Sequence, residues 1–277
     1  MTRPYVEVIG DPIAHSKSPL IHNFWLEKLG IDAEYRATHV RPDELADYFA
    51  RRRGDAAWRG CNVTIPHKQT ALDLLADKDR RAAAIGAINT VYRTGDRRLV
   101  GTNTDSVGVG EAIRELTLIG ADVCVIGAGG AARAAFSQLA ASRCAAVLIL
   151  ARDPRKALQT ASEFDIFAVG VEFAPGSTAL CEASLLINAT QLGLEGQDAM
   201  PDFLLAELAE MPRDAAVFDM VYSPVETPLL AQARALGLRT IDGLQMLVGQ
   251  AAAAFELFFG RTAPREHDAE LRALLTS

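Results

Sequence analysis

Short apolar runs, several of them alternating with polar residues, divide the first third of the chain into predicted elements. Four runs predict β-strands, at residues 5–10, 34–40, 60–65 and 88–93. The segments 18–30 and 42–53 carry apolar residues at helical spacing and predict helices between the first three strands. Because strands alternate with helices, we expect an α/β domain with a mostly parallel sheet.

A second series of apolar runs follows residue 116. It predicts strands at residues 122–127, 146–151, 167–171, 184–190 and 216–222, separated by helical segments such as 131–140 and 154–164. These runs are apolar almost throughout, which is typical of parallel strands buried on both faces. A long apolar helix at 243–260 and an amphipathic helix at 268–275 end the chain.

The length of the chain supports two domains. Its 277 residues exceed the roughly 100 to 200 residues of one usual domain. A helix that starts at Asp105, after the polar segment GTNT, marks the predicted boundary, so the first domain covers residues 1–105. Helical spacing alone assigns the last helices to neither domain.

Charge and composition exclude several classes of function. The formal net charge of −7 argues against a nucleic-acid partner, because binding to the phosphate backbone requires a basic face. The first residues lack the apolar segment of a signal peptide, and no run of about 18 apolar residues occurs. The four cysteines have no close pair, which matches neither a zinc site nor a disulfide framework. We expect a cytoplasmic protein with reduced cysteines, no bound metal and no membrane partner.

The clearest chemical signal is the glycine-rich turn after the predicted strand 122–127. Gly127-Ala128-Gly129-Gly130-Ala131-Ala132 has the G-x-G-x-x-G/A spacing and opens a predicted helix. Glycines here permit a tight turn and a close approach of the backbone to a pyrophosphate, which the helix N-terminus attracts. The segment therefore predicts a dinucleotide site.

The end of the next predicted strand bears on which dinucleotide binds. An acidic side chain there binds the ribose 2′-hydroxyl of NAD, whereas arginine accommodates the 2′-phosphate of NADP. Arg152 and Lys156 favour NADP, because guanidinium and ammonium groups bind phosphate. Asp153 would repel a phosphate unless its carboxylate caps the helix that Pro154 begins, and we predict this capping role. NADP is the predicted cofactor, and NAD stays an alternative.

Polar segments follow the predicted strands of the first domain: HSKSP (15–19), NVTIPHK (62–68), AINT (87–90) and GTNTD (101–105). Parallel sheets bind ligands at the carboxyl ends of their strands, so these segments are expected to converge. Each also has a purely structural interpretation. Ser18 and Asp105 suit helix N-caps, Asn89 suits a partner for loop backbone, and Lys68 suits the turn that Pro66 starts.

Taken together, the same residues suggest one chemistry. The hydroxyls of Ser16, Ser18 and Thr64 suit a small carboxylate, and Asn89 and Asp105 suit ring hydroxyls. A lysine paired with an aspartate moves the proton that is needed when a cofactor hydride reduces a ketone.

With these residues, the sequence resembles the shikimate dehydrogenase family over almost its whole length. The matching segments, in family order, are GDPIAHSKSPLIHN, NVTIPHK, GAINTV, GTNTD, GAGGAARA, NAT, DMVYSPVETPLL and DGLQMLVGQAAAAF. The resemblance implies a two-domain α/β enzyme, with a Rossmann-like cofactor domain at 106–242 and C-terminal helices (243–277) that complete the substrate domain. It implies NADP-dependent interconversion of 3-dehydroshikimate and shikimate, a step of aromatic amino acid biosynthesis. The implied partner is this small-molecule substrate; a homodimer is compatible with the sequence, but no residue decides it.

The resemblance also implies roles for individual residues. Lys68 and Asp105 match the catalytic pair of the family. Substrate-binding positions are matched by Ser16, Ser18, Thr64, Asn89, Tyr222 and Gln250. Cofactor-binding positions are matched by residues 127–132, Arg152, Lys156, Thr190, Met220 and Gly243. The family asks nothing of His67, so we do not expect it to be catalytic.

Three positions depart from the family pattern. Ala151-Arg152-Asp153 replaces the usual Asn-Arg-Thr, Gln191 replaces a serine, and Gln245 replaces a glycine. The first departure keeps an NAD-dependent quinate/shikimate dehydrogenase as an alternative. A non-catalytic sensor of a cofactor or metabolite is a second alternative, and the presence of both catalytic residues argues against it.

Overall fold

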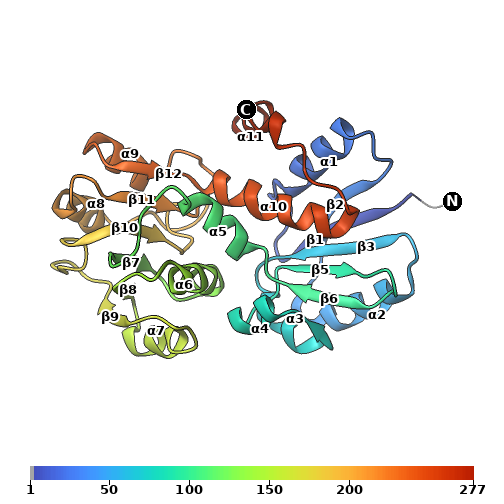
Figure 1. The fold of residues 1–277 in the computed structure, drawn as a ribbon, viewed down its shortest axis with the longest axis horizontal. Coiled ribbons are helices and arrows are strands. Elements are labelled where there is room, and N and C mark those ends of the chain that lie inside the picture. The colour runs from blue at the N-terminus through green and yellow to red at the C-terminus, as the bar shows by residue number, and fades with distance from the viewer. Residues whose placement is uncertain (1–2) are drawn as a thin grey trace. The chain divides into compact units, whose positions relative to one another are not determined.

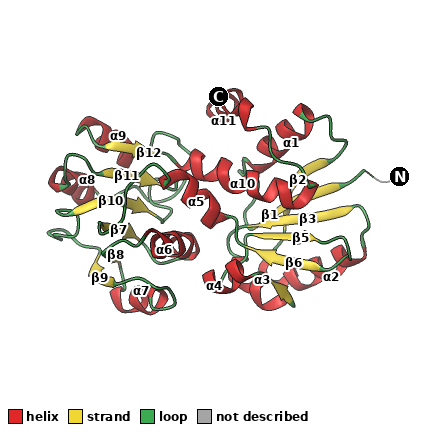
Figure 2. Cartoon of the chain, in the orientation of Figure 1, coloured by secondary structure: helices red, strands yellow, loops and turns green. Residues whose placement is uncertain are grey.

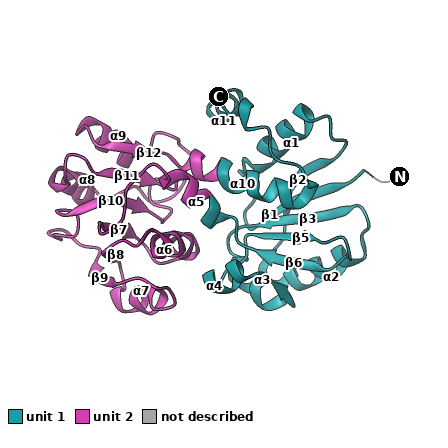
Figure 3. Cartoon of the chain, viewed as in Figure 1, with its two compact units in different colours: residues 1–107, 248–277 teal, residues 108–247 magenta. Residues whose placement is uncertain are grey.

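The chain folds into two compact units (Figure 3). The structure is a computed structural model that describes residues 3–277. Unit 1 comprises residues 1–107 and 248–277, and unit 2 comprises residues 108–247. Each unit is built on one six-stranded sheet with helices packed on both faces (Figures 1 and 2). The predicted α/β class is confirmed.

The sheet of unit 1 has the strand order β2-β1-β3-β5-β6-β4. Its strands are β1 (Tyr5–Gly10), β2 (Glu34–His39), β3 (Trp58–Val63), β4 (Asp77–Lys78), β5 (Thr90–Arg93) and β6 (Leu99–Thr102). β1 pairs in parallel with β2 and β3, and β4 with β6. β5 is antiparallel to β3 and β6, so the sheet is mixed rather than uniformly parallel.

Helices cover both faces of this sheet. They are α1 (Ser18–Lys28), α2 (Leu45–Gly54), α3 (Lys68–Leu74), α4 (Arg80–Ile85), α10 (Gly243–Phe259) and α11 (Asp268–Thr276). Side chains of α2, α3 and α4 pack on one face. Side chains of α10 pack on the other face, where α1 also lies.

A buried carboxylate joins α2 to the sheet of unit 1. Glu7 on β1 has no exposed surface, and its oxygens accept hydrogen bonds from Arg52 (2.7 and 2.8 Å), Tyr48 (2.7 Å) and Thr38 (2.7 Å). Burial raises the pKa of Glu7, but the hydrogen bonds outweigh this effect and hold the pKa below its ordinary value. The charge is therefore retained and bound inside the unit.

The sheet of unit 2 is parallel throughout, with the order β12-β11-β10-β7-β8-β9. Its strands are β7 (Asp122–Ile126), β8 (Ala146–Ala151), β9 (Ala168–Glu172), β10 (Ala183–Asn188), β11 (Ala216–Asp219) and β12 (Arg239–Ile241). Strands are added outward from β7 to β9, and the chain then returns to pair β10 with the free side of β7. This is the doubly wound Rossmann order, whose ligand crevice lies at the reversal between β7 and β10.

The helices of unit 2 lie on both faces of its sheet. They are α5 (Asp105–Ile113), α6 (Gly130–Ser142), α7 (Pro154–Ala161), α8 (Asp202–Glu207) and α9 (Pro228–Ala235). Side chains of α5, α6 and α7 pack on one face and those of α8 and α9 on the other. Short 3₁₀ turns occur at Pro42–Glu44, Leu208–Glu210 and Arg265–His267.

Candidate active site

Lys68 lies at the start of a helix and not in the turn that the sequence predicted. β3 ends at Val63, a cis peptide bond joins Ile65 to Pro66, and α3 begins at Lys68. The Lys68 side chain is 20% exposed, and its Nζ lies 2.6 Å from Oδ2 of Asp105. The structure thus brings the two residues of the predicted catalytic pair into contact.

Asp105 directs its carboxylate at side chains and does not cap a helix. It is the first residue of α5; its Oδ1 accepts a hydrogen bond from Asn89 Nδ2 at 2.8 Å, and its Oδ2 accepts from Lys68. The predicted N-cap role is wrong, because Asn103 Oδ1 accepts the backbone N–H of Ser106 at 3.4 Å in its place. Asp105 is 6% exposed, so its charge is stabilised by these two donors more than by water.

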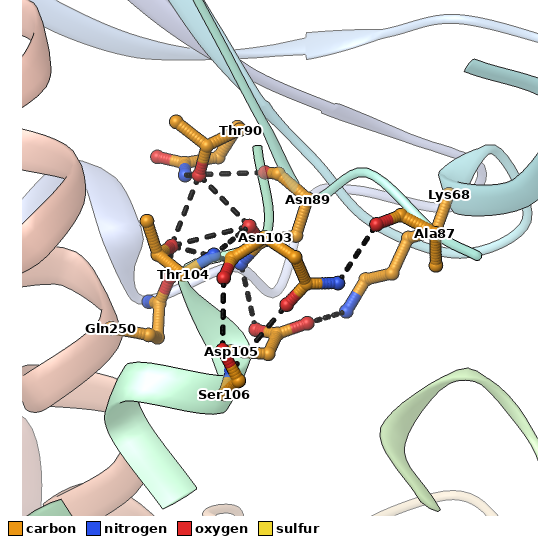
Figure 4. Close-up of polar contacts among 10 residues, drawn as sticks. Lys68, Ala87, Asn89, Thr90, Asn103, Thr104, Asp105, Ser106 and Gln250 are labelled. Carbon is orange, nitrogen blue, oxygen red and sulfur yellow. Dashed lines mark hydrogen bonds and ion pairs between the residues drawn. The ribbon is translucent and has the colours of Figure 1, made fainter. Parts of the chain in front are cut away.

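Asn89 is the centre of a buried polar network (Figure 4). Its Oδ1 accepts the backbone N–H of Thr104 at 2.7 Å and the hydroxyl of Thr90 at 3.0 Å. Its Nδ2 donates to Thr104 Oγ1 at 3.0 Å as well as to Asp105. Thr104 also donates to Oε1 of Gln250 on α10, at 3.5 Å. Asn89 therefore satisfies loop backbone, as its structural interpretation predicted, and also fixes the Asp105 carboxylate.

The predicted carboxylate-binding serines lie at the start of α1. Ser18 is the first helical residue and Lys17 holds the N-cap position, so the predicted N-cap role of Ser18 is wrong. Ser16 Oγ accepts the backbone N–H of Ser18 at 3.3 Å. Lys17 donates from Nζ to the carbonyl of Leu275 at 2.5 Å, which ties this turn to α11.

The segment after β3 also places Thr64 and His67. Thr64 is half-buried, and its Cγ2 would lie 2.5 Å from a Cβ added to Gly10, so the ends of β1 and β3 touch. His67 is 1% exposed, and its Nε2 lies 2.7 Å from the carbonyl oxygen of Val40. This contact of the ring with a backbone carbonyl favours a structural role, and the expectation that His67 is not catalytic stays a prediction.

Four polar residues of this network lie in the segments expected to converge but were given no role of their own: Asn62, Thr90, Asn103 and Thr104. Each is at most 6% exposed. Asn62 donates to Thr90 at 2.9 Å, and the hydroxyls of Thr90 and Thr104 lie 3.0 Å apart. Their signal was a polar side chain inside or next to a short strand, because a buried polar group requires a partner.

In unit 2, the glycine-rich turn meets the loop after β10. Gly127 has φ +94°, a left-handed conformation that favours glycine, and a Cβ there would lie 2.7 Å from Thr190 Cγ2. β7 and β10, which precede these two residues, are the strands where the sheet order reverses. Gly130 begins α6, and Ala131 and Ala132 follow in its first turn, where Ala132 is fully buried in the core.

A pocket of about 730 Å³ opens at the carboxyl ends of β7 and β8. Its lining includes Gly127, Ala128, Gly129, Arg152, Lys156 and Thr190. Asp153 also lines it, and its Oδ1 accepts the backbone N–H of Lys156 at 3.0 Å as the N-cap of α7. The predicted capping role of Asp153 is confirmed.

The pocket fits an NADP-type dinucleotide. The tight turn at Gly127 leaves no room for a side chain, and the N-terminus of the 13-residue α6 attracts a pyrophosphate. Arg152 and Lys156 are exposed beyond β8 and supply two cations for a 2′-phosphate. Asp153 adds one negative charge, but one of its oxygens is engaged by the helix backbone.

Other predicted residues of unit 2 lie after β10, β11 and β12. A Cβ on Gly243 would lie 2.7 Å from the carbonyl oxygen of Met220, so these two cofactor candidates are in contact. Tyr222 follows them, and burial raises the pKa of its phenol. Gln191 lines the pocket, whereas Gln245 is exposed on the first turn of α10.

The predictions about metals and thiols concern the whole chain. Within residues 3–277, no group of three or more His, Cys, Asp or Glu side chains could hold a metal ion. No helix in this range is long and apolar enough to cross a membrane. All four cysteines are free, with Cys61 and Cys124 buried and Cys181 exposed.

Comparisons with known proteins point to one family. The shikimate dehydrogenase substrate binding domain matches residues 8–91, shikimate / quinate 5-dehydrogenase matches 110–193, and the shikimate 5′-dehydrogenase C-terminal domain matches 243–270. The shikimate dehydrogenase (NADP(+)) of Sphingopyxis alaskensis is 50% identical over 274 residues, which cover 99% of this chain and 97% of that protein.

Solved structures agree with this result. Shikimate 5-dehydrogenase of Thermus thermophilus, in complex with NADP(H) and shikimate, aligns with a TM-score of 0.85 and 36% identity, over 98% of this chain and 99% of that one. The ligand-free 5-ketofructose reductase of Gluconobacter sp. strain CHM43 aligns with a TM-score of 0.88 and 30% identity, over 99% of each chain.

Proposed function

This chain belongs to the shikimate dehydrogenase family, and from that premise we propose that it catalyses the reversible NADPH-dependent reduction of 3-dehydroshikimate to shikimate. It is an oxidoreductase, and the family places its reaction in the biosynthesis of aromatic amino acids. The observation that carries the proposal is the 2.6 Å contact between Lys68 Nζ and Asp105 Oδ2. A lysine and an aspartate in this arrangement suit proton transfer to a ketone.

Lys68 is the proposed acid and base. Its ammonium group donates a proton to the substrate oxygen during reduction, and its neutral amine accepts the proton in the reverse direction. When bound, NADPH supplies the hydride. Asp105 holds the lysine and is itself held by Asn89, so the proton donor is oriented before the substrate arrives.

The substrate is proposed to bind through hydroxyl and amide groups. Ser16, Ser18 and Thr64 are proposed to donate to its carboxylate, which three hydroxyl donors suit. Asn89 is proposed to bind the ring hydroxyls, and Tyr222 and Gln250 are proposed to contact the substrate as well. The burial of Asn89 and its bond to Asp105 support a fixed, directional contact.

NADP is the cofactor, in keeping with the NADP(+)-dependent relatives and with the two cations beyond β8. Arg152 and Lys156 are proposed to bind its 2′-phosphate, and residues 127–132 its pyrophosphate. Thr190, Met220 and Gly243 are proposed to contact the nicotinamide half.

A four-way steady-state assay at 340 nm tests the proposal, with NADP⁺ and NAD⁺ each measured against shikimate and quinate. We expect the highest kcat/KM with NADP⁺ and shikimate. An equal or higher value with NAD⁺ and quinate would support the alternative dehydrogenase, which the carboxylate of Asp153 beside Arg152 keeps open. Tight cofactor binding without any absorbance change at saturating substrate would overturn the enzymatic proposal and indicate a sensor.

A further inference from the structure

A buried chain of hydrogen bonds starts at Tyr35 on β2 and ends at the carboxylate that holds the proposed catalytic lysine. The Tyr35 O–H donates to Oδ1 of Asn62 at 2.6 Å. Asn62 Nδ2 donates to Thr90 at 2.9 Å, and the Thr90 hydroxyl donates to Asn89 Oδ1 at 3.0 Å. Asn89 Nδ2 then donates to Asp105 at 2.8 Å. Every member of the chain is at most 6% exposed.

All the bonds of this chain run in the same direction. A carboxylate only accepts, so Asn89 turns its amide nitrogen to Asp105 and its oxygen to Thr90. The Thr90 hydroxyl uses its proton on Asn89 and is left as an acceptor for the amide nitrogen of Asn62. The oxygen of Asn62 therefore needs a donor at the far end, and Tyr35 supplies it.

The first helix holds Tyr35 by its ring and by its backbone. The ring stacks on His22, with 4.1 Å between centroids and an interplanar angle of 4°. Burial lowers the pKa of His22 to about 3, so the imidazole is neutral at neutral pH. Asn23 donates to the Tyr35 carbonyl at 2.7 Å and accepts the Tyr35 N–H at 2.9 Å. The phenol is therefore fixed in place before any ligand binds.

The phenol also faces Ser18. Burial raises the pKa of Tyr35 well above its ordinary value, and a hydrogen bond from Ser18 acts in the opposite direction. A proton given by Ser18 to the phenol oxygen leaves the phenol proton free for Asn62. Since Ser18 is a proposed ligand of the substrate carboxylate, the chain joins the carboxylate-binding residues to the proton-transferring residues.

We propose that Tyr35 is a positioning residue, which orients the lysine–aspartate pair without touching the substrate. Without its O–H, the Asn62 oxygen is buried without a donor, whereas Asn62 Nδ2 still has the Thr90 hydroxyl and the Asn89 carbonyl oxygen (3.3 Å) as acceptors. The Asn62 amide is then held on one side alone, so the Thr90 hydroxyl that it binds is less firmly oriented toward Asn89. Asp105 loses a neighbour of fixed orientation, so the acid is less well placed. The inference rests on the proposed function of the pair.

Tyr35→Phe removes one oxygen and preserves the ring, and Tyr48→Phe is its matched control. Tyr48 is also buried in unit 1 and donates to Glu7 at 2.7 Å, but it packs in the cluster on the other face of the sheet and has no bond to the chain. With NADP⁺ and shikimate, kcat of Tyr35→Phe is expected to fall roughly 5- to 30-fold, because Asp105 and Lys68 are then less well placed for proton transfer. The KM of Tyr35→Phe for NADP⁺ should stay within about twofold of the wild-type value, because the substitution does not touch unit 2. The kcat of Tyr48→Phe should also stay within about twofold of the wild-type value, because Tyr48 does not contact the catalytic pair.

A double variant tests whether the effect travels along the chain. Thr90→Val removes the middle hydroxyl, so adding Tyr35→Phe should cost little further kcat, whereas independent effects would multiply. Urea unfolding of each variant verifies that it is folded under the assay conditions.

Three results would overturn the inference: kcat of Tyr35→Phe within twofold of wild type, an equal loss of kcat in Tyr48→Phe, or effects of Tyr35→Phe and Thr90→Val that multiply fully. All three results concern variants, and none of them requires the wild-type enzyme to be inactive. A wild-type enzyme inactive on shikimate overturns the proposed function itself, so the two failures are distinguishable.

Discussion

Replacing Lys68 with methionine separates its proton transfer from its structural role. Methionine retains an unbranched apolar stem and removes the ammonium group. Loss of a general acid–base group lowers kcat by about 100- to 10,000-fold, which corresponds to about 3 to 5 kcal/mol of transition-state stabilisation. Cofactor affinity should be unchanged, because the residues that line the cofactor pocket belong to unit 2.

The same substitution should also destabilise unit 1. Asp105 is 6% exposed and would retain Asn89 as its one side-chain donor. Removing one partner of a fully buried ion pair costs about 3 to 5 kcal/mol, and the 20% exposure of Lys68 reduces this to about 1 to 2 kcal/mol. In the double variant Lys68→Met/Asp105→Asn the unpaired charge is gone, so most of the lost stability should return.

Steady-state kinetics at 340 nm and urea unfolding measure both effects. We expect the double variant to recover stability without recovering kcat. If Lys68→Met kept more than about a tenth of the wild-type kcat, or if the double variant regained activity, Lys68 would not be the acid.

Three further predictions concern single residues. Glu7→Gln removes a carboxylate whose pKa is held below its ordinary value of 4.5. Such a carboxylate stabilises the fold above pH 4.5, and this stabilisation is lost as the pH falls through the lowered pKa. The free energy of unfolding, measured in urea, should therefore fall less steeply in acid for the variant than for the wild type. His67→Gln should keep kcat within about threefold while lowering the free energy of unfolding by about 1 to 2 kcal/mol; a hundredfold loss of kcat would make His67 catalytic after all. Asp153→Asn keeps a capping side chain but removes a charge beside Arg152, so the KM for NADP⁺ should fall about 2- to 5-fold and that for NAD⁺ should not change; equal KM values in variant and wild type would place the carboxylate too far from the phosphate to matter.

The cofactor unit was the part of the fold most accessible from sequence. Its strands are buried on both faces and read as apolar runs, and the glycine turn after β7 has a specific spacing. The sheet of unit 1 was harder, because periodicity carries no information on strand direction: the strand at β5 was predicted, but its antiparallel direction was not. β4 and β6 have two and four residues, which is too short for a period to show.

The roles of several site residues depend on partners that are distant in the sequence, so the local sequence context does not predict them. Asp105 has the sequence context of a helix cap, yet its oxygens bond to residues 16 and 37 positions away. Tyr35 has the sequence context of an ordinary aromatic residue in a β-strand, and nothing near it in sequence indicates a hydrogen bond to Asn62. Such roles depend on which side chains the fold brings together, and spacing along the chain does not encode them.

The two hydrogen bonds between the Asn23 side chain and the Tyr35 backbone also bear on aggregation. β2 is the edge strand of its sheet, and an exposed edge is a template on which another chain can add a strand. At Tyr35 both backbone groups that such a strand would need are already bonded to the Asn23 amide. A side chain from α1 thus occupies the hydrogen-bonding sites of a missing neighbour strand, and the edge is protected at this register against intermolecular β-pairing.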